Sequence, residues 1–174
     1  MEKQLYASTS KMGTFGCFEV TIGWFGSERV DYLTYDTKGI WRCYEIKASK
    51  FDFYSDAKKT FVGHFNYFVM PHSLYEEVKH DIPEYVGVYA EGRYSIKKAK
   101  RRELLVDDQV LKDSMIRSLA RDSGKLYKIN DPKYIEKMNR RIAELEKERD
   151  DWRNKYQKLM NIGYEKYGSG WYRV

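Results

Sequence analysis

Residues 28–48 read ERVDYLTYDTKGIWRCYEIKA, and this stretch decides the fold. Its two flanks, 28–36 and 40–48, are rich in the β-branched and aromatic residues that favour strands. The loop between them, 37–39, ends in glycine and follows Asp36, a favoured first residue of a type I turn. Such a loop pairs Asp36 with Ile40 and, counting outward, Asp31 with Glu45. The stretch therefore predicts an antiparallel hairpin in which two acids face each other.

A third strand is expected just before this hairpin, at 17–23 (CFEVTIG). The loop 24–26 (WFG) would pair residue 23 with residue 27, and so Glu19 with Asp31. Side chains alternate between the two faces of a strand, and neighbouring strands lie about 4.8 Å apart. We therefore expect Glu19, Asp31 and Glu45 to form a row on one face of the sheet, with Lys47 on that same face. A slip of one residue would separate the acids.

The remaining pattern predicts an α/β protein with a mixed sheet flanked by helices. Further strands are expected at 65–70 and 85–90, and residues 51–61 have helical spacing. The capping box at 73–76 (SLYE) opens a short helix that runs to about residue 80. The predicted order of elements over residues 1–92 is βββαβαβ.

A basic segment follows this core, at 93–102 (RYSIKKAKRR). It leads into a helix near 108–122, with Leu111, Met115 and Leu119 on one face and Gly124 as a stop, so 93–124 is expected to be a linker and helix. The basic run is either a solvated linker or an arm that contacts phosphates. Its basic residues are Arg93, Lys97, Lys98, Lys100, Arg101 and Arg102.

The segment 125–174 differs in kind, because it carries a heptad pattern after an Asp131-Pro132 start signal. A spacing of 3 and 4 in alternation favours a coiled coil, and we expect a homodimer through 132–160. A helix packed singly on the body is the alternative. The pattern is formed by Ile135, Met138, Ile142, Leu145, Arg149, Trp152, Tyr156 and Leu159. The aromatic tail, 163–174, has no interpretation.

Composition narrows the classes of function. Of the 174 residues, 42% are hydrophobic and 33% are charged, and 32 basic against 26 acidic residues give a net charge of +6, which suits a polyanionic partner. No apolar run approaches the roughly 20 residues of a membrane span, and the N-terminus lacks the pattern of a secretory signal, so a cytoplasmic protein is expected. Two cysteines without a CxxC pair, and three histidines without HxH or HExxH spacing, leave oxygen ligands for any metal.

The expected row of acids indicates a chemistry. Two carboxylates about 5 Å apart repel by roughly 3 kcal/mol at an effective dielectric near 20. A divalent cation such as Mg²⁺ or Mn²⁺ would relieve this repulsion, and Lys47 could hold an attacking water. Acids, a metal ion and a lysine are the parts that hydrolyse a phosphodiester. The alternative is that Asp31 and Glu45 are ordinary solvent-facing residues of an amphipathic sheet.

Asp31, followed after thirteen residues by Glu45-Ile46-Lys47, resembles the bipartite motif of the PD-(D/E)XK restriction-endonuclease-like nucleases. More specifically, residues 19–91 resemble the MmcB-like DNA repair proteins of bacteria and phage. Val30 stands where the family has proline before its first aspartate. The stretches that carry the likeness are 28–33 (ERVDYL), 44–49 (YEIKAS) with Asp52, Phe53 and Asp56 behind it, 64–71 (HFNYFVMP) and 82–89 (IPEYVGVY).

This resemblance implies a metal-dependent nuclease that acts on DNA in repair, recombination or phage DNA metabolism. Asp31 and Glu45 would be metal ligands, Lys47 the catalytic lysine and Glu19 the additional acid these proteins carry before the motif. Asp52 and Asp56 are expected behind the site, at the start of a helix. The alternative is a nucleic-acid-binding or assembly module that keeps the fold without turnover.

Aromatic side chains in expected loops could stack on DNA bases, namely Tyr6, Trp24, Phe25, Trp171 and Tyr172.

Overall fold

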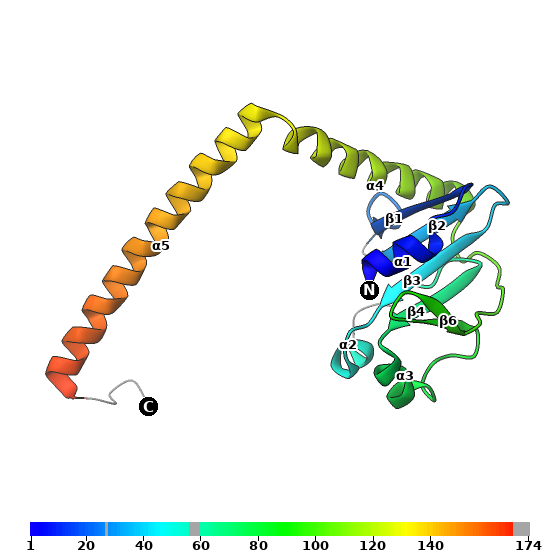
Figure 1. The fold of residues 1–174 in the computed structure, drawn as a ribbon, viewed down its shortest axis with the longest axis horizontal. Coiled ribbons are helices and arrows are strands. Elements are labelled where there is room, and N and C mark those ends of the chain that lie inside the picture. Colours follow the sequence, from blue (N-terminus) through cyan, green and yellow to red (C-terminus); the bar gives the residue numbers. More distant parts are fainter. Residues whose placement is uncertain (27, 56–59, 169–174) are drawn as a thin grey trace. The chain divides into compact units, whose positions relative to one another are not determined.

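A computed structural model of the chain describes residues 1–26, 28–55 and 60–168. It contains one mixed sheet of six strands in the order β1-β2-β3-β4-β5-β6, flanked by helices (Figure 1), which confirms the expected α/β class. The β3-β4 and β4-β5 pairs are parallel, and the other neighbouring strands are antiparallel. The elements are α1 (Glu2–Thr9), β1 (Thr14–Thr21), β2 (Arg29–Asp36), β3 (Trp41–Ile46), α2 (Lys50–Tyr54), β4 (Phe65–Met70), α3 (His72–Val78), β5 (Val86–Ala90), β6 (Tyr94–Lys97), α4 (Asp108–Ile129) and α5 (Pro132–Tyr167).

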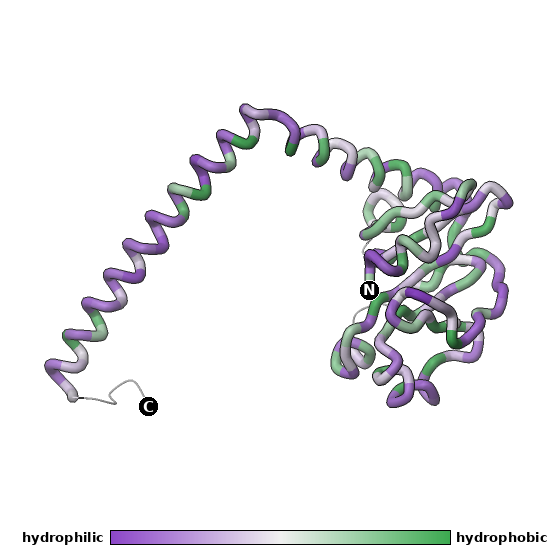
Figure 2. The backbone as a smooth tube through the Cα atoms, viewed as in Figure 1, coloured by the Kyte–Doolittle hydropathy of each residue, from purple (hydrophilic) through white to green (hydrophobic). Residues whose placement is uncertain are grey.

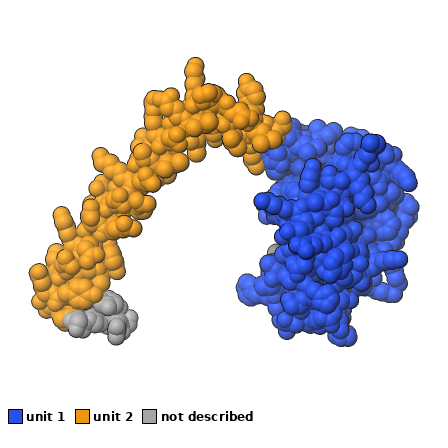
Figure 3. All heavy atoms as spheres, in the orientation of Figure 1, with its two compact units in different colours: residues 1–122 blue, residues 123–174 orange. Residues whose placement is uncertain are grey.

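The chain divides into two compact units, residues 1–122 and 123–174 (Figure 3). This division lies close to the boundary expected after residue 124. The boundary expected after residue 92 falls inside the first unit, because the segment beyond it is part of the sheet and its core. Strand β6 pairs with β5, and α4 buries Leu111 and Met115 in the first unit. Residues 93–97 are thus an edge strand with its turn rather than a linker. Among the described residues, no helix combines the length and the apolar character that crossing a bilayer requires.

The register of the first three strands is the one expected from the turns. Phe18 pairs with Tyr32 and Val20 with Val30, while Tyr32 pairs with Tyr44 on its other side. Gly39 has a φ of +77°, as the loop after Asp36 requires. In the first loop the left-handed glycine is Gly23 rather than Gly26, and the expected partner of Gly23, residue 27, lies outside the described residues.

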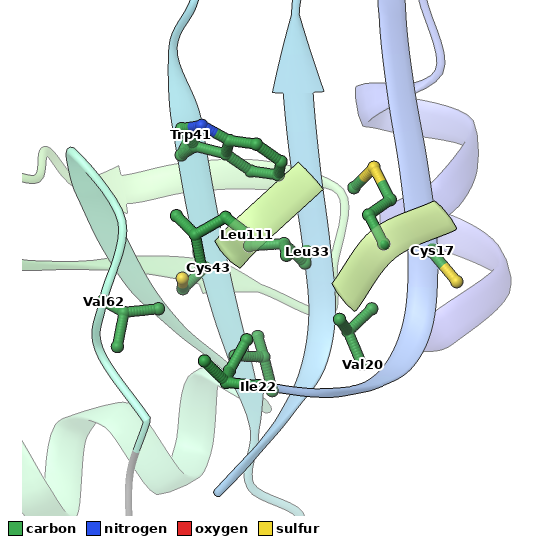
Figure 4. Packing of buried hydrophobic residues seen from close by; sticks show 10 residues of the cluster. Cys17, Val20, Ile22, Leu33, Trp41, Cys43, Val62 and Leu111 are labelled. Carbon is green, nitrogen blue, oxygen red and sulfur yellow. The ribbon is translucent and has the colours of Figure 1, made fainter. Parts of the chain in front are cut away.

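The sheet separates two sets of buried side chains. Cys17, Leu33, Trp41 and Cys43 pack with Val62 and Leu111 on one face (Figure 4). Both cysteines lie opposite Leu33 in their ladders, and both are free thiols. A second cluster around Phe68 and Met70 continues this face across β4 and β5. The opposite face is aromatic and is formed by Tyr32, Tyr44 and Val69 with Leu5 of α1.

Helix α4 is fixed to the sheet by polar contacts as well as by its apolar face. The Trp41 indole Nε1 donates to Asp108 Oδ1 at 2.6 Å at the start of the helix. The guanidinium of Arg117 donates to the carbonyls of Thr21 and Gly23 at the first hairpin.

Two of our expectations about helix α4 are wrong. Leu119 is exposed while Ser118 is buried, and the helix continues through Gly124 to residue 129 because one interior glycine weakens a helix without ending it.

Three further features differ from the sequence interpretation. The helix expected at 51–61 is shorter, since α2 ends at Tyr54 and residues 60–63 are not helical. Strand β6 and helix α1 were not expected. Helix α1 has only eight residues, which is too short to be stable alone, and Leu5 anchors it by full burial among the aromatic residues of the sheet. Gly92 permits this approach, because a Cβ there would lie 2.6 Å from the Met1 carbonyl oxygen.

Leu5→Ala is expected to lower the free energy of unfolding by about 3 kcal/mol, because it opens a cavity in the aromatic face. Chemical denaturation of Leu5→Ala and of Tyr6→Ala, a control at the exposed neighbouring position, measures this difference. Equal stability of the two variants would show that α1 is not part of the folded core.

Candidate active site

The candidate site begins where β2 and β3 part. The last pair in their ladder on this side is Tyr32–Tyr44, while β3 stays paired with β4 through Glu45–Phe68 and Ile46–Val69. Beyond that point a side chain replaces a backbone partner, since Asp31 Oδ2 accepts a hydrogen bond from the Ile46 amide at 2.8 Å. The carboxylate of one strand is therefore held against the end of the next.

Two charged side chains of the β3 end are almost fully buried. Glu45 is 3% exposed and Lys47 5% exposed. They are two residues apart in an extended segment and so share a face of the sheet. Glu45 Oε1 accepts from the Thr60 amide at 3.3 Å, and Lys47 Nζ lies 3.5 Å from Asp52 Oδ1. The hydroxyl of Thr60 is buried and has no hydrogen-bond partner within the described part of the chain.

The electrostatics show that these groups act on one another. The pKa of Glu45 is raised to about 8, first by burial and then by the nearby charge of Asp31, while Lys47 opposes the change. Burial also raises the pKa of Asp31, against the lowering effects of the Ile46 hydrogen bond and of Lys47. Asp31, Glu45 and Lys47 therefore converge as the sequence predicted. Burial and the charge of Asp31 both favour the protonated form of Glu45.

Glu19 takes a different direction from the one expected. Its backbone is left-handed, with a φ of +56°, and its carboxylate forms an ion pair with Arg29 at 2.6 Å. Cys17 and Val20 belong to the same buried cluster although they are three residues apart, so the alternation of faces shifts at this point. The row of three acids therefore does not form. Within the described ranges, no group of three or more histidine, cysteine, aspartate or glutamate side chains is arranged to hold a metal ion.

Asp52 begins a helix, as expected, and it also contacts the site. Ser49 Oγ accepts from the Asp52 amide at 3.2 Å, while Asp52 Oδ2 accepts from the Ala48 amide at 3.0 Å. The contact with Lys47 was not predicted, although the Ser-x-x-Asp capping spacing points to a fixed carboxylate at this position. No sequence signal marks Thr60. Asp56 lies outside the described residues.

The basic segment lies on another part of the sheet. Strand β6 is three positions from β3, which corresponds to about 14 Å. Lys97 Nζ donates to the carbonyls of Ile82 and Pro83, Lys100 pairs with Glu84, and the Arg102 guanidinium lies 4.2 Å from the Tyr85 ring centre. The remaining three, Arg93, Lys98 and Arg101, are exposed. The structure thus does not bring the basic run to the acids.

Other candidate residues are placed as follows. Trp24 and Phe25 are exposed, as expected. Tyr6 is half exposed, but it lies in helix α1 and not in the expected loop. The guanidinium of Arg117 lies 5.2 Å from the Trp24 ring centre. His64 has a structural contact, because its Nδ1 accepts from the Trp41 amide at 3.0 Å. Trp171 and Tyr172 lie outside the described residues.

The donor set of this site suits a hard divalent cation. Mg²⁺ commonly takes one or two protein carboxylates and fills its other positions with water and phosphate oxygens. Asp31 and Glu45 supply two such carboxylates, and their raised pKa values indicate that the positive charge already present does not fully compensate them. A cation there would favour the ionised form of both.

Comparison with known proteins adds a fold relationship. No family model and no curated protein matches the chain. A solved structure described as SPO1766, a protein of unknown function from Silicibacter pomeroyi, is similar with a TM-score of 0.54. The match covers 75% of this chain and 86% of that chain at 20% identity. At this identity the likeness shows a shared fold.

The raised pKa of Glu45 predicts a pH dependence of stability in metal-free buffer. From the ordinary value of 4.5 to about 8, the folded protein keeps a proton on Glu45 that the unfolded chain has released. The contribution of Glu45 to the free energy of unfolding is therefore expected to fall as pH rises through this range. Urea unfolding at pH 5, 6.5 and 8 should show a shallower decline for Glu45→Gln than for wild type or for Glu103→Gln, a control at an exposed acid. Parallel curves for Glu45→Gln and wild type would contradict the assigned environment.

Proposed function

We propose that this protein is a metal-dependent nuclease that hydrolyses phosphodiester bonds in DNA. The observation that carries the proposal is the convergence of Asp31, Glu45 and Lys47 at the parting of β2 and β3. Two carboxylates and one ammonium group meet there, with Asp31 on β2, Glu45 on β3 and Lys47 directly after β3. The resemblance of 28–33 and 44–49 to the nuclease motif supports the same assignment.

Each residue has a role that follows from its chemistry. Asp31 and Glu45 would hold Mg²⁺ or Mn²⁺, which supplies Lewis acidity and lowers the pKa of a bound water. Lys47 can orient the attacking water or offset negative charge that develops on the phosphate. Asp52 holds the Lys47 ammonium at 3.5 Å and so acts as a positioning residue. Glu19, paired with Arg29, influences Asp31 through its charge rather than as a member of one ligand group.

A purely structural ion pair accounts for the charges of Asp31, Glu45 and Lys47 less well than a functional site does. A buried structural ion pair is stable when its charges are balanced and its polar atoms are satisfied. Here the buried Lys47 is near three carboxylates, those of Asp31, Glu45 and Asp52. The pKa of Glu45 is far from its ordinary value, and the neighbouring Thr60 hydroxyl has no partner in the described residues. Groups with strongly shifted pKa values and unmet polar atoms are typical of functional sites.

A second candidate is a binding module that keeps this fold without turnover. It is favoured by one observation, namely that the basic segment lies about three strands from the acids. Contacts with a nucleic-acid backbone through that segment could therefore form without engaging the acids. This candidate predicts DNA binding that survives Glu45→Ala and does not require a metal ion.

Nicking of supercoiled plasmid with Mn²⁺ tests the enzyme proposal. Asp31→Asn, Glu45→Gln and Lys47→Met are each expected to lower the rate by at least about 100-fold, because each removes a group at the reacting centre. Glu19→Gln is expected to lower it by less than about tenfold. Controls at Glu84→Gln and Lys50→Ala, both exposed, should retain full activity.

Unfolding midpoints of the same variants separate loss of activity from loss of structure. Activity unchanged in Asp31→Asn and in Lys47→Met, or absent from wild type with Mg²⁺ and Mn²⁺, would overturn the nuclease proposal. Wild-type DNA binding without cutting would then favour the binding module.

DNA affinity is expected to depend on the exposed part of the basic segment. Replacing Arg93, Lys98 and Arg101 by glutamine removes three possible phosphate contacts. The plot of log affinity against log salt should become less steep by about 2 to 3, since each contact with duplex DNA contributes roughly 0.9. Fluorescence anisotropy with a labelled duplex measures this slope. An unchanged slope would show that DNA does not bind along this edge.

A further inference from the structure

Helix α5 presents a seam of apolar residues, interrupted only at Arg149, that nothing in the described chain covers. The seam consists of the heptad residues, whose apolar and aromatic members are between 43% and 70% exposed. Within residues 135–159, every residue outside the seam except Ala143 is polar or charged. Hydrophilic and hydrophobic colours accordingly alternate along the backbone of α5 (Figure 2). The seam residues are Ile135, Met138, Ile142, Leu145, Arg149, Trp152, Tyr156 and Leu159.

The period of the seam indicates how it is covered. Alternating steps of 3 and 4 place Ile135, Ile142 and Tyr156 at a positions and Met138, Leu145, Trp152 and Leu159 at d positions of a heptad. This narrow stripe with period 3.5 is the geometry of two helices that wind around each other. It spans 25 residues, or about 37 Å of helix.

The charged residues beside the seam determine which partner fits. Arg141 and Glu148 occupy g positions, and Glu146 and Arg153 occupy e positions. In a parallel, in-register pair, each g residue faces the e residue five positions later on the partner. Arg141 then faces Glu146 of the partner subunit, and Glu148 faces Arg153 of the partner subunit. Symmetry doubles both contacts, so all four are attractive.

The antiparallel arrangement over the same span gives the opposite result. There g residues face g residues and e residues face e residues. Arg141 would face Lys155 of the partner subunit, while Glu148 and Glu146 would each face their own counterparts. All these pairs have like charges, and like charges at such positions disfavour pairing.

We propose that α5 forms a parallel, in-register, two-stranded coiled coil with α5 of a second copy of this chain. Arg149, the charged residue at an a position, meets its own counterpart in this arrangement, which is one like-charge contact against the four attractive ones. A single polar a residue fixes the register and the number of strands at a cost in stability. The self-complementary charges make a second copy, rather than an unrelated helix, the occupant. This inference is independent of the nuclease proposal.

Sedimentation equilibrium and cysteine cross-linking of the full chain test the arrangement. The protein is expected to sediment as a dimer. Leu145→Cys, at a d position, should form a disulfide between subunits under mild oxidation, whereas the control Lys147→Cys, on the outer face of the helix, should not. The two native cysteines are buried and give little background. A monomeric wild type, or equal cross-linking at both positions, would overturn the proposal.

Charge reversal separates the two orientations. Arg141→Glu is expected to weaken a parallel dimer about tenfold, because two attractive pairs become repulsive. It would tighten an antiparallel dimer by placing glutamate opposite Lys155. Adding Glu146→Arg should restore the parallel dimer. Arg140→Glu is the matched control, since Arg140 also loses an ion pair within its helix, with Glu136, but lies away from the seam. Tighter association of Arg141→Glu would overturn the parallel arrangement.

Discussion

The hydrogen bond from the Ile46 amide to the Asp31 carboxylate is the contact on which the candidate site depends. It lies where β2 leaves β3 while β4 continues to hold β3 in place. A backbone amide at the end of a ladder needs an acceptor, and here a charged side chain provides it. The same contact fixes Asp31 beside Glu45 and Lys47, so the end of a sheet ladder and the start of a chemical site are one feature.

Keeping the carboxylates of Asp31 and Glu45 buried and close together is energetically unfavourable. Burial disfavours the charged forms of Asp31 and Glu45. The charge of Asp31 further disfavours ionisation of Glu45, and the charge of Glu19 further disfavours ionisation of Asp31. Lys47, itself buried and held by Asp52, offsets only part of this. A divalent cation bound between these carboxylates would favour their ionised forms. The apolar residues of the α5 seam are also exposed, and the charged residues beside the seam are complementary to those of a second copy of the helix.

The sequence predicted those parts of the molecule that short-range chemistry determines. The turn after Asp36 set the register that places Asp31 opposite Glu45, and period-two alternation put Lys47 beside Glu45. The prediction for Glu19 was wrong because its left-handed backbone shifts the alternation, which no residue type signals. Helix α1 was missed because one buried leucine stabilises it through contacts far away in sequence. Thr60 was missed for the same reason, since only the fold brings its amide to Glu45.

The most direct test is anomalous diffraction from crystals of the full chain grown with Mn²⁺. The account predicts a manganese peak within about 2.3 Å of carboxylate oxygens from both Asp31 and Glu45, a distance typical of oxygen ligands of divalent cations. It also predicts that the peak disappears in crystals of Glu45→Gln. Strong peaks elsewhere, with none between these two side chains, would contradict it.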